Sequence, residues 1–217
     1  MTDIKFCGMT RSADARLAFE LGAAYIGVVF AGGPRRQDDA GAAAIFAGVA
    51  ASGGRVGVFG AEPPGVIAAR AKALGLQAVQ LHGDPRAADV QAMRAAWHGE
   101  VWAVLRVAGA ELPAHAAELF RAADAVLLDA KVDGALGGTG VALAWDEIAG
   151  AVAELRGRGA RLVLAGGLRP ENVASAVRAL HPDVVDVSSG IESTVGIKDA
   201  GRMRAFRDAV RSAGAAR

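Results

Sequence analysis

The sequence predicts an α/β fold in which residues 1–217 form one (β/α)8 barrel domain, the TIM barrel architecture. Three observations lead to this prediction. Short apolar segments recur along the chain, segments with helical periodicity lie between them, and no long linker interrupts the alternation. Strands that alternate with helices form parallel sheets. Eight such repeats fit a small closed barrel, and a doubly wound open sheet is the alternative.

The expected strands are bounded by Gly, Asp or Pro and are rich in Val, Ile, Leu and aromatic residues. This composition is typical of strands that are covered on both faces. In chain order they are Ile4–Cys7, Tyr25–Phe30, Arg55–Phe59, Ala78–Leu81, Val101–Val107, Ala125–Leu128, Arg161–Leu164 and Val184–Val187.

The segments between these strands place apolar residues at i, i+3, i+4 and i+7, the spacing of a helix that buries one face. The pattern is clear over Ala15–Gly22, with Ser12 as the candidate N-cap. It returns over Val173–Leu180, where Pro170 suits a first helical turn. A sparser stripe over Met203–Val210 predicts the last helix.

The composition is that of a globular and not a disordered protein. Apolar residues make up 53% of the chain, and Lys plus Arg (24) nearly balance Asp plus Glu (23). We therefore expect no nucleic-acid partner. Apolar stretches fall short of the ~18 residues of a membrane span, and the N-terminus lacks a secretory layout, so we expect no membrane association and a cytoplasmic location. The single cysteine, Cys7, excludes an intramolecular disulfide and a cysteine-built metal site.

Reactive and backbone-exposing residue types gather just after the expected strands. In parallel α/β folds this carboxyl end of the sheet carries the chemistry. Gly166 and Gly167 follow the seventh strand, and Ser189 and Gly190 follow the eighth. Loops at these two strands often bind phosphate in barrels, and glycines let the backbone approach an anion. The alternative is that these glycines only form tight turns.

Three residues could take part in proton transfer or in structure. Cys7 is either a small core residue or a thiol that meets substrate at the end of the first strand. Asp129 either caps a loop or, at that depth, has a raised pKa and donates a proton. Asp186 interrupts a buried strand, so its carboxylate needs a hydrogen-bond network or a ligand.

Three further residues could contact a ligand. Arg35 and Arg36 offer bidentate recognition of a carboxylate, or they form a solvated pair. His82 is either a hydrogen-bonded residue of the barrel rim or a ligand contact.

Taken in order, these motifs resemble the phosphoribosylanthranilate isomerase family of tryptophan biosynthesis over nearly the whole chain. The motifs are Lys5–Thr10, Val56–Phe59, Gln80–Gly83, Asp129 with Gly137–Gly140, Ala165–Leu168 before Asn172-Val173, Asp186–Glu192 and Gly196–Asp199.

The resemblance implies a (β/α)8-barrel aldose-ketose isomerase that carries out an Amadori rearrangement. Its substrate would be N-(5′-phosphoribosyl)anthranilate, a small phosphorylated molecule, and no metal or other cofactor would be required. It further implies that Cys7 is the general base and Asp129 the general acid. An arginine after the second strand would bind the anthranilate carboxylate, and the loops after the last two strands would bind the phosphate.

The chain departs from the family pattern at the arginine. Spacing from Phe30 favours Arg36, whereas adjacency to Pro34 favours Arg35. We slightly prefer Arg36 and leave the pair open, together with the choice between monomer and homodimer. Gly60 also replaces the usual apolar residue after the Val56–Phe59 motif.

Two other functions are considered. The analogous isomerase of histidine biosynthesis resembles this chain in fold and chemistry, but that family has aspartate in place of Cys7 and a longer chain with two-fold repetition. A non-catalytic phosphosugar-binding barrel would not need both Cys7 and Asp129.

Overall fold

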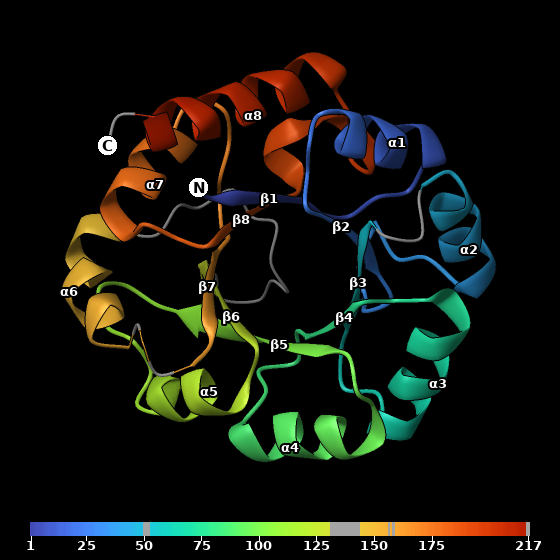
Figure 1. Ribbon diagram of the computed structural model, residues 1–217, viewed down its shortest axis with the longest axis horizontal. Coiled ribbons are helices and arrows are strands. Elements are labelled where there is room, and N and C mark those ends of the chain that lie inside the picture. Colours follow the sequence, from blue (N-terminus) through green and yellow to red (C-terminus); the bar gives the residue numbers. More distant parts are fainter. Residues whose placement is uncertain (50–52, 131–143, 156, 158, 216–217) are drawn as a thin grey trace.

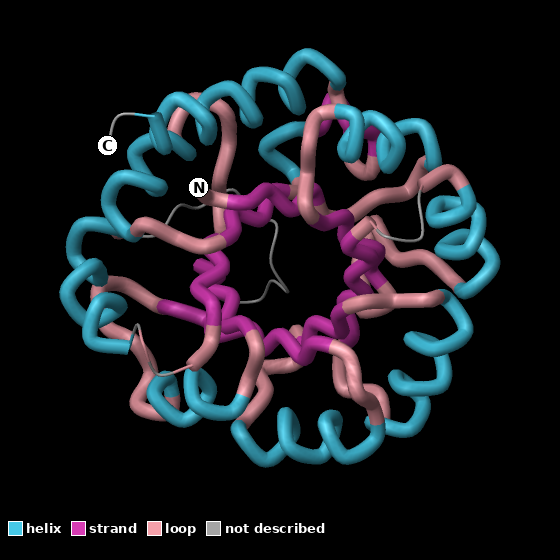
Figure 2. The backbone as a smooth tube through the Cα atoms, in the orientation of Figure 1, coloured by secondary structure: helices cyan, strands magenta, loops and turns pink. Residues whose placement is uncertain are grey.

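The computed structural model describes residues 1–49, 53–130, 144–155, 157 and 159–215. Eight parallel strands pair in chain order and close into a barrel. Closure is direct, because β1 pairs with β2 on one side and with β8 on the other. The strands form the inner ring and the helices the outer ring (Figures 1 and 2). The predicted closed barrel is thus confirmed, and the open sheet is excluded.

Each expected strand is present; three have the predicted bounds, and the ends of the others differ by one or two residues. The barrel strands are β1 Asp3–Phe6, β2 Tyr25–Val29, β3 Gly54–Phe59, β4 Ala78–Leu81, β5 Glu100–Val107, β6 Ala125–Ala130, β7 Arg161–Leu164 and β8 Val184–Val187. A short 3-10 helix, η1 (Ser189–Ile191), and a two-stranded hairpin of β9 (Glu192–Thr194) and β10 (Ile197–Lys198) follow β8. The longer β6 places Asp129 inside the strand, whereas the sequence predicted it just after the strand.

The helices cover the outside of the barrel. They are α1 Ser12–Glu20, α2 Asp39–Ala47, α3 Pro64–Leu74, α4 Ala87–Ala96, α5 Ala116–Ala122, α6 Trp145–Leu155, α7 Val173–Leu180 and α8 Ala200–Ala215. Among the helices of the described ranges, none is long and apolar enough to cross a membrane.

Two helix starts differ from their predictions. Ser12 is the first residue of α1, and Arg11 occupies the N-cap with no capping side chain. Pro170 lies in a turn before α7, whose N-cap is Asn172. The Asn172 side chain accepts a hydrogen bond from the Arg169 N–H at 2.8 Å. Pro170 therefore belongs to this turn and not to the first turn of α7.

The strands divide the core into two layers. Side chains that point outward pack against the helices, as Phe6 does against Phe206 of α8 with ring centroids 6.1 Å apart. A smaller cluster that includes Trp102, Val104 and Leu127 fills the barrel interior. Burying an aliphatic or aromatic side chain of this size contributes about 1.5–3 kcal/mol. Trp102 lies toward the amino ends of the strands.

Candidate active site

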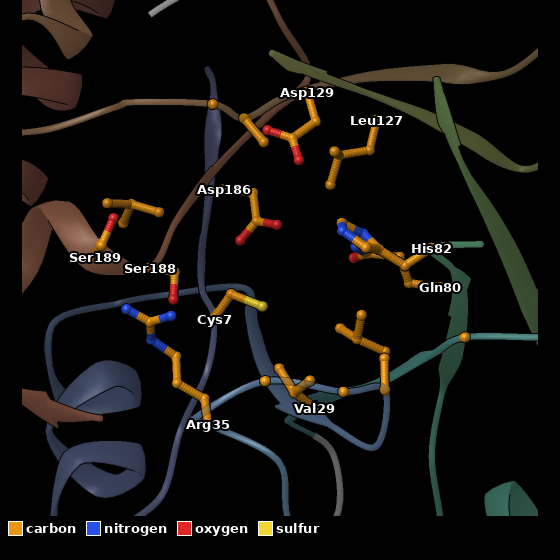
Figure 3. A pocket seen from close by; sticks show the side chains of 18 of the residues that line it. Cys7, Val29, Arg35, Gln80, His82, Leu127, Asp129, Asp186, Ser188 and Ser189 are labelled. Atoms are coloured by element: carbon orange, nitrogen blue, oxygen red, sulfur yellow. The ribbon is translucent and has the colours of Figure 1, made fainter. Parts of the chain in front are cut away.

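A cavity of about 590 Å³ opens at the carboxyl ends of the strands. It brings together residues that are far apart in sequence and that the sequence analysis singled out. Those that line it are Cys7, Arg35, His82, Asp129, Gly166, Gly167, Asp186 and Ser189. In Figure 3, Asp186 lies between Cys7 and Asp129. Arg36 and Gly190 are not among the lining residues.

Cys7 lies directly after β1 with its thiol in the cavity. The side chain is 8% exposed. Burial raises the pKa of the Cys7 thiol above its ordinary value, and the nearby Asp186 carboxylate raises it further. Lys5 and Lys198 oppose this shift without cancelling it. At neutral pH and without substrate, Cys7 is therefore a protonated thiol.

Asp186 belongs to a hydrogen-bonded network inside the barrel. Its Oδ2 atom lies 2.8 Å from Nζ of Lys5, which also donates to Oε1 of Gln80 at 2.9 Å. The Gln80 amide nitrogen lies 3.4 Å from Nδ1 of His82. The other Asp186 oxygen, Oδ1, is buried and has no hydrogen-bond partner among the described residues. The buried carboxylate thus has a structural partner on one oxygen and room for a ligand donor on the other.

Asp129, the second-last residue of β6, lines the same cavity. It is 7% exposed. Burial, and then the Asp186 carboxylate, raise the pKa of Asp129 to about 6, despite the opposing effects of Arg106, the Ala130 N–H and Lys5. A carboxyl group with this pKa can hold or release a proton near neutral pH.

The two arginines after β2 have different surroundings. Arg35 lines the cavity and binds Glu192 of β9 through two hydrogen bonds of 2.7 Å. Lys198 of β10 donates to the same carboxylate at 2.9 Å. Burial alone would raise the pKa of Glu192, but hydrogen bonds from Arg35 and Lys198 bring it below its ordinary value. Arg36 is exposed, and its Nε donates to the carbonyl of Phe30 at 3.3 Å.

The loops after β7 and β8 approach each other closely at glycines. Gly166 and Gly167 adopt φ values of +81° and +63°, in the left-handed region that favours glycine. A side chain at Gly190 would collide with the carbonyl of Leu168. These glycines bring backbone groups of both loops to one edge of the cavity. The predicted motif Gly137–Gly140 lies outside the described residues.

Sequence reasoning assigned no role to Lys5, Gln80, Glu192 or Lys198, although each lies within one of the quoted motifs. It also assigned no role to Gly27 of β2, which lies against the side chains of Lys5 and Cys7. Within the part of the chain that the structure describes, no three His, Cys, Asp or Glu residues are grouped so that they could hold a metal ion.

Comparisons with known proteins agree with the geometry. The family model for N-(5′-phosphoribosyl)anthranilate isomerase matches residues 4–209. The enzyme of that name from Pseudomonas fluorescens strain Pf0-1 is 40% identical over 208 residues, which cover 95% of this chain and 97% of the relative.

Solved structures give the same result. Phosphoribosylanthranilate isomerase from Thermotoga maritima has a TM-score of 0.86 at 32% identity, covering 98% of this chain and 100% of the other. A phosphoribosylanthranilate isomerase in complex with reduced 1-(o-carboxyphenylamino)-1-deoxyribulose 5-phosphate has a TM-score of 0.83 at 31% identity, with the same coverage. The chain belongs to the phosphoribosylanthranilate isomerase family.

Proposed function

We propose that the cavity catalyses the Amadori rearrangement of N-(5′-phosphoribosyl)anthranilate to 1-(2-carboxyphenylamino)-1-deoxyribulose 5-phosphate, with Asp129 as general acid and Cys7 as general base. The observation that carries this proposal is that two buried proton-transfer groups face one cavity from β6 and from the end of β1. The reaction needs proton transfer at two different atoms of the sugar, which two separate groups can perform.

The first step opens the furanose ring. Asp129 donates a proton to the ring oxygen while the bond between C1′ and that oxygen breaks, and the nitrogen lone pair forms a protonated Schiff base. In the second step the Cys7 thiolate removes the proton from C2′, which gives an enolamine. Tautomerisation of the enolamine yields the ketose. The substrate loses one proton and gains one, so the sequence is balanced without a redox partner.

The two pKa shifts constrain how protons are distributed. The reactive enzyme has a proton on Asp129 and none on Cys7. Without substrate, the proton is mainly on Cys7 and Asp129 is ionised, because the pKa of Asp129 is about 6 and that of Cys7 is raised. Both forms contain the same number of protons, so the reactive form is a constant minor fraction wherever the pair holds one proton. The cation formed on ring opening favours the thiolate by charge attraction.

We expect the purified protein to convert phosphoribosylanthranilate with a plateau in its pH profile. kcat/KM should rise as pH increases through about 6, because below this value both groups are protonated and the base is lost. It should fall above the raised pKa of Cys7, where neither group retains a proton. The loss of substrate fluorescence measures turnover. Binding of the phosphorylated substrate without turnover would support a non-catalytic phosphosugar-binding barrel instead.

Arg35 is the better candidate for binding the anthranilate carboxylate. Arg35 lines the cavity, whereas Arg36 does not. The geometry therefore favours Arg35, which adjacency to Pro34 indicated, over Arg36, which spacing from Phe30 indicated. Loop backbone at Gly166, Gly167, Ser189 and Gly190 would receive the phosphate. His82 and the free Oδ1 of Asp186 would contact the sugar.

Replacing Arg35 should weaken substrate binding more than replacing Arg36. Loss of a charge-assisted contact costs about 2 kcal/mol, which corresponds to an increase in KM of roughly thirtyfold if the contact is equally strong throughout the reaction. We therefore expect Arg35→Ala to raise KM by this amount and Arg36→Ala to have a smaller effect. Steady-state kinetics of the two variants, which differ by one position in the same loop, decide between them. The opposite order would return the assignment to Arg36.

A further inference from the structure

Lys5 is a fully buried cation for which the proposed mechanism has no role. Its side chain is 0% exposed within the barrel. A buried ammonium ion is costly unless charged or polar groups surround it. Asp186 at 2.8 Å and Gln80 at 2.9 Å supply two such partners. Burial lowers the pKa of Lys5, but attraction to the Asp186 carboxylate, and to Cys7 once it is a thiolate, outweighs this effect and keeps the pKa above its ordinary value. Lys5 is therefore a cation at neutral pH.

Lys5 and Cys7 point into the barrel side by side. Alternate residues of a strand share a face, so they point inward while Phe6 points outward to α8. Gly27 of β2 supplies the room. A methyl group on Gly27 would lie 2.7 Å from Sγ of Cys7 and 3.2 Å from Nζ of Lys5. Both atoms therefore border the space that the missing side chain of Gly27 leaves. The Lys5 ammonium therefore lies close enough to the Cys7 sulfur to favour its thiolate form.

We infer that Lys5 is a positioning residue that stabilises the thiolate form of Cys7, and that Asp186 and Gln80 hold its ammonium group in place. Other charges also face Cys7: Asp186 from β8, Lys198 from β10 and Arg35 from the loop after β2. Asp186 opposes the thiolate and the cations favour it, with Lys5 the strongest of the cations. The catalytic meaning of this inference rests on the proposed function. The charge relation between Lys5 and Cys7 does not.

The single cysteine makes this relation measurable without substrate. Iodoacetamide reacts with the thiolate, so the rate of Cys7 alkylation against pH gives both the thiol pKa and the accessibility of the sulfur. We expect Lys5→Met to move the midpoint to higher pH and to slow alkylation about tenfold or more below it, as expected for the loss of a close opposite charge. The rate at high pH should change little. We expect Asp186→Asn to move the midpoint in the opposite direction.

The control is Lys72→Met, which removes an exposed lysine of α3 and should leave the profile unchanged. If Lys5→Met does not fold, Lys5→Met with Asp186→Asn removes both buried charges and is compared with Asp186→Asn alone. The double variant should be alkylated more slowly at a given pH. An unchanged midpoint on removal of Lys5, in either background, would overturn the inference. Activity of Cys7→Ser would instead refute the proposed base and leave this measurement intact.

Discussion

Cys7→Ser is expected to lower kcat by about 100-fold or more while changing substrate affinity much less. Serine retains the size of cysteine and its place after β1, but a hydroxyl group is far less acidic than a thiol. Even with Lys5 nearby, the alkoxide would not form in useful amounts, and removal of the proton from C2′ would lose its base. Steady-state fluorescence kinetics give kcat and KM separately, and thermal unfolding shows whether the fold is retained.

The effect should appear in kcat because the thiolate acts on C2′ only after ring opening. Binding of the carboxylate and the phosphate involves other side chains, so a large change in KM alone would indicate a packing defect around this buried residue. Near-normal turnover by a folded Cys7→Ser protein would exclude Cys7 as the base.

The sequence predicts the barrel well because its strands carry a strong local signal. Each short apolar run became a strand, and β1 pairs with β8 as barrel closure requires. Helix starts were less predictable because they depend on contacts from distant segments. Arg11 occupies the N-cap of α1, where its guanidinium binds Asp14 and the carbonyl of Lys198 in β10. The local sequence pointed to Ser12 as the capping residue, because it does not reveal that Arg11 contacts the distant hairpin.

Reactive residues are expected just after the ends of parallel strands, and this rule located the cavity. It did not locate every charged group that shifts the pKa values of the cavity residues. Lys5 lies before the end of β1, yet its spacing of two from Cys7 was a usable signal that both face the interior. The ion pair of Arg35 with Glu192 could not be found in this way, because it joins the loop after β2 to the hairpin after β8. A one-residue choice between Arg35 and Arg36 likewise depends on loop geometry, which residue types alone do not determine.

Asp129→Asn is expected to reduce activity to background. The amide keeps the shape and polarity of the side chain but has no acidic proton to give to the ring oxygen. Burial and the neighbouring Asp186 explain why the native carboxyl holds its proton at a pH near 6, well above the ordinary range for aspartate. Because the substrate carboxylate and phosphate bind elsewhere in the cavity, affinity for a product analogue should stay within about tenfold of the native value.

Asp186→Asn is the matched variant, since it removes the other cavity carboxylate and leaves Asp129 in place. Without the charge of Asp186, the pKa of Asp129 should fall, and the limb of the pH profile near 6 should move to lower pH. Substantial activity in Asp129→Asn would show that another acid opens the ring, with Asp186 the first to test. Loss of both activity and folded structure would assign Asp129 a structural role. From the geometry of β6 and β8 we expect two results. The Asp129→Asn protein should be folded and inactive and should still bind the product analogue. The Asp186→Asn protein should show the limb of its pH profile near 6 shifted to lower pH.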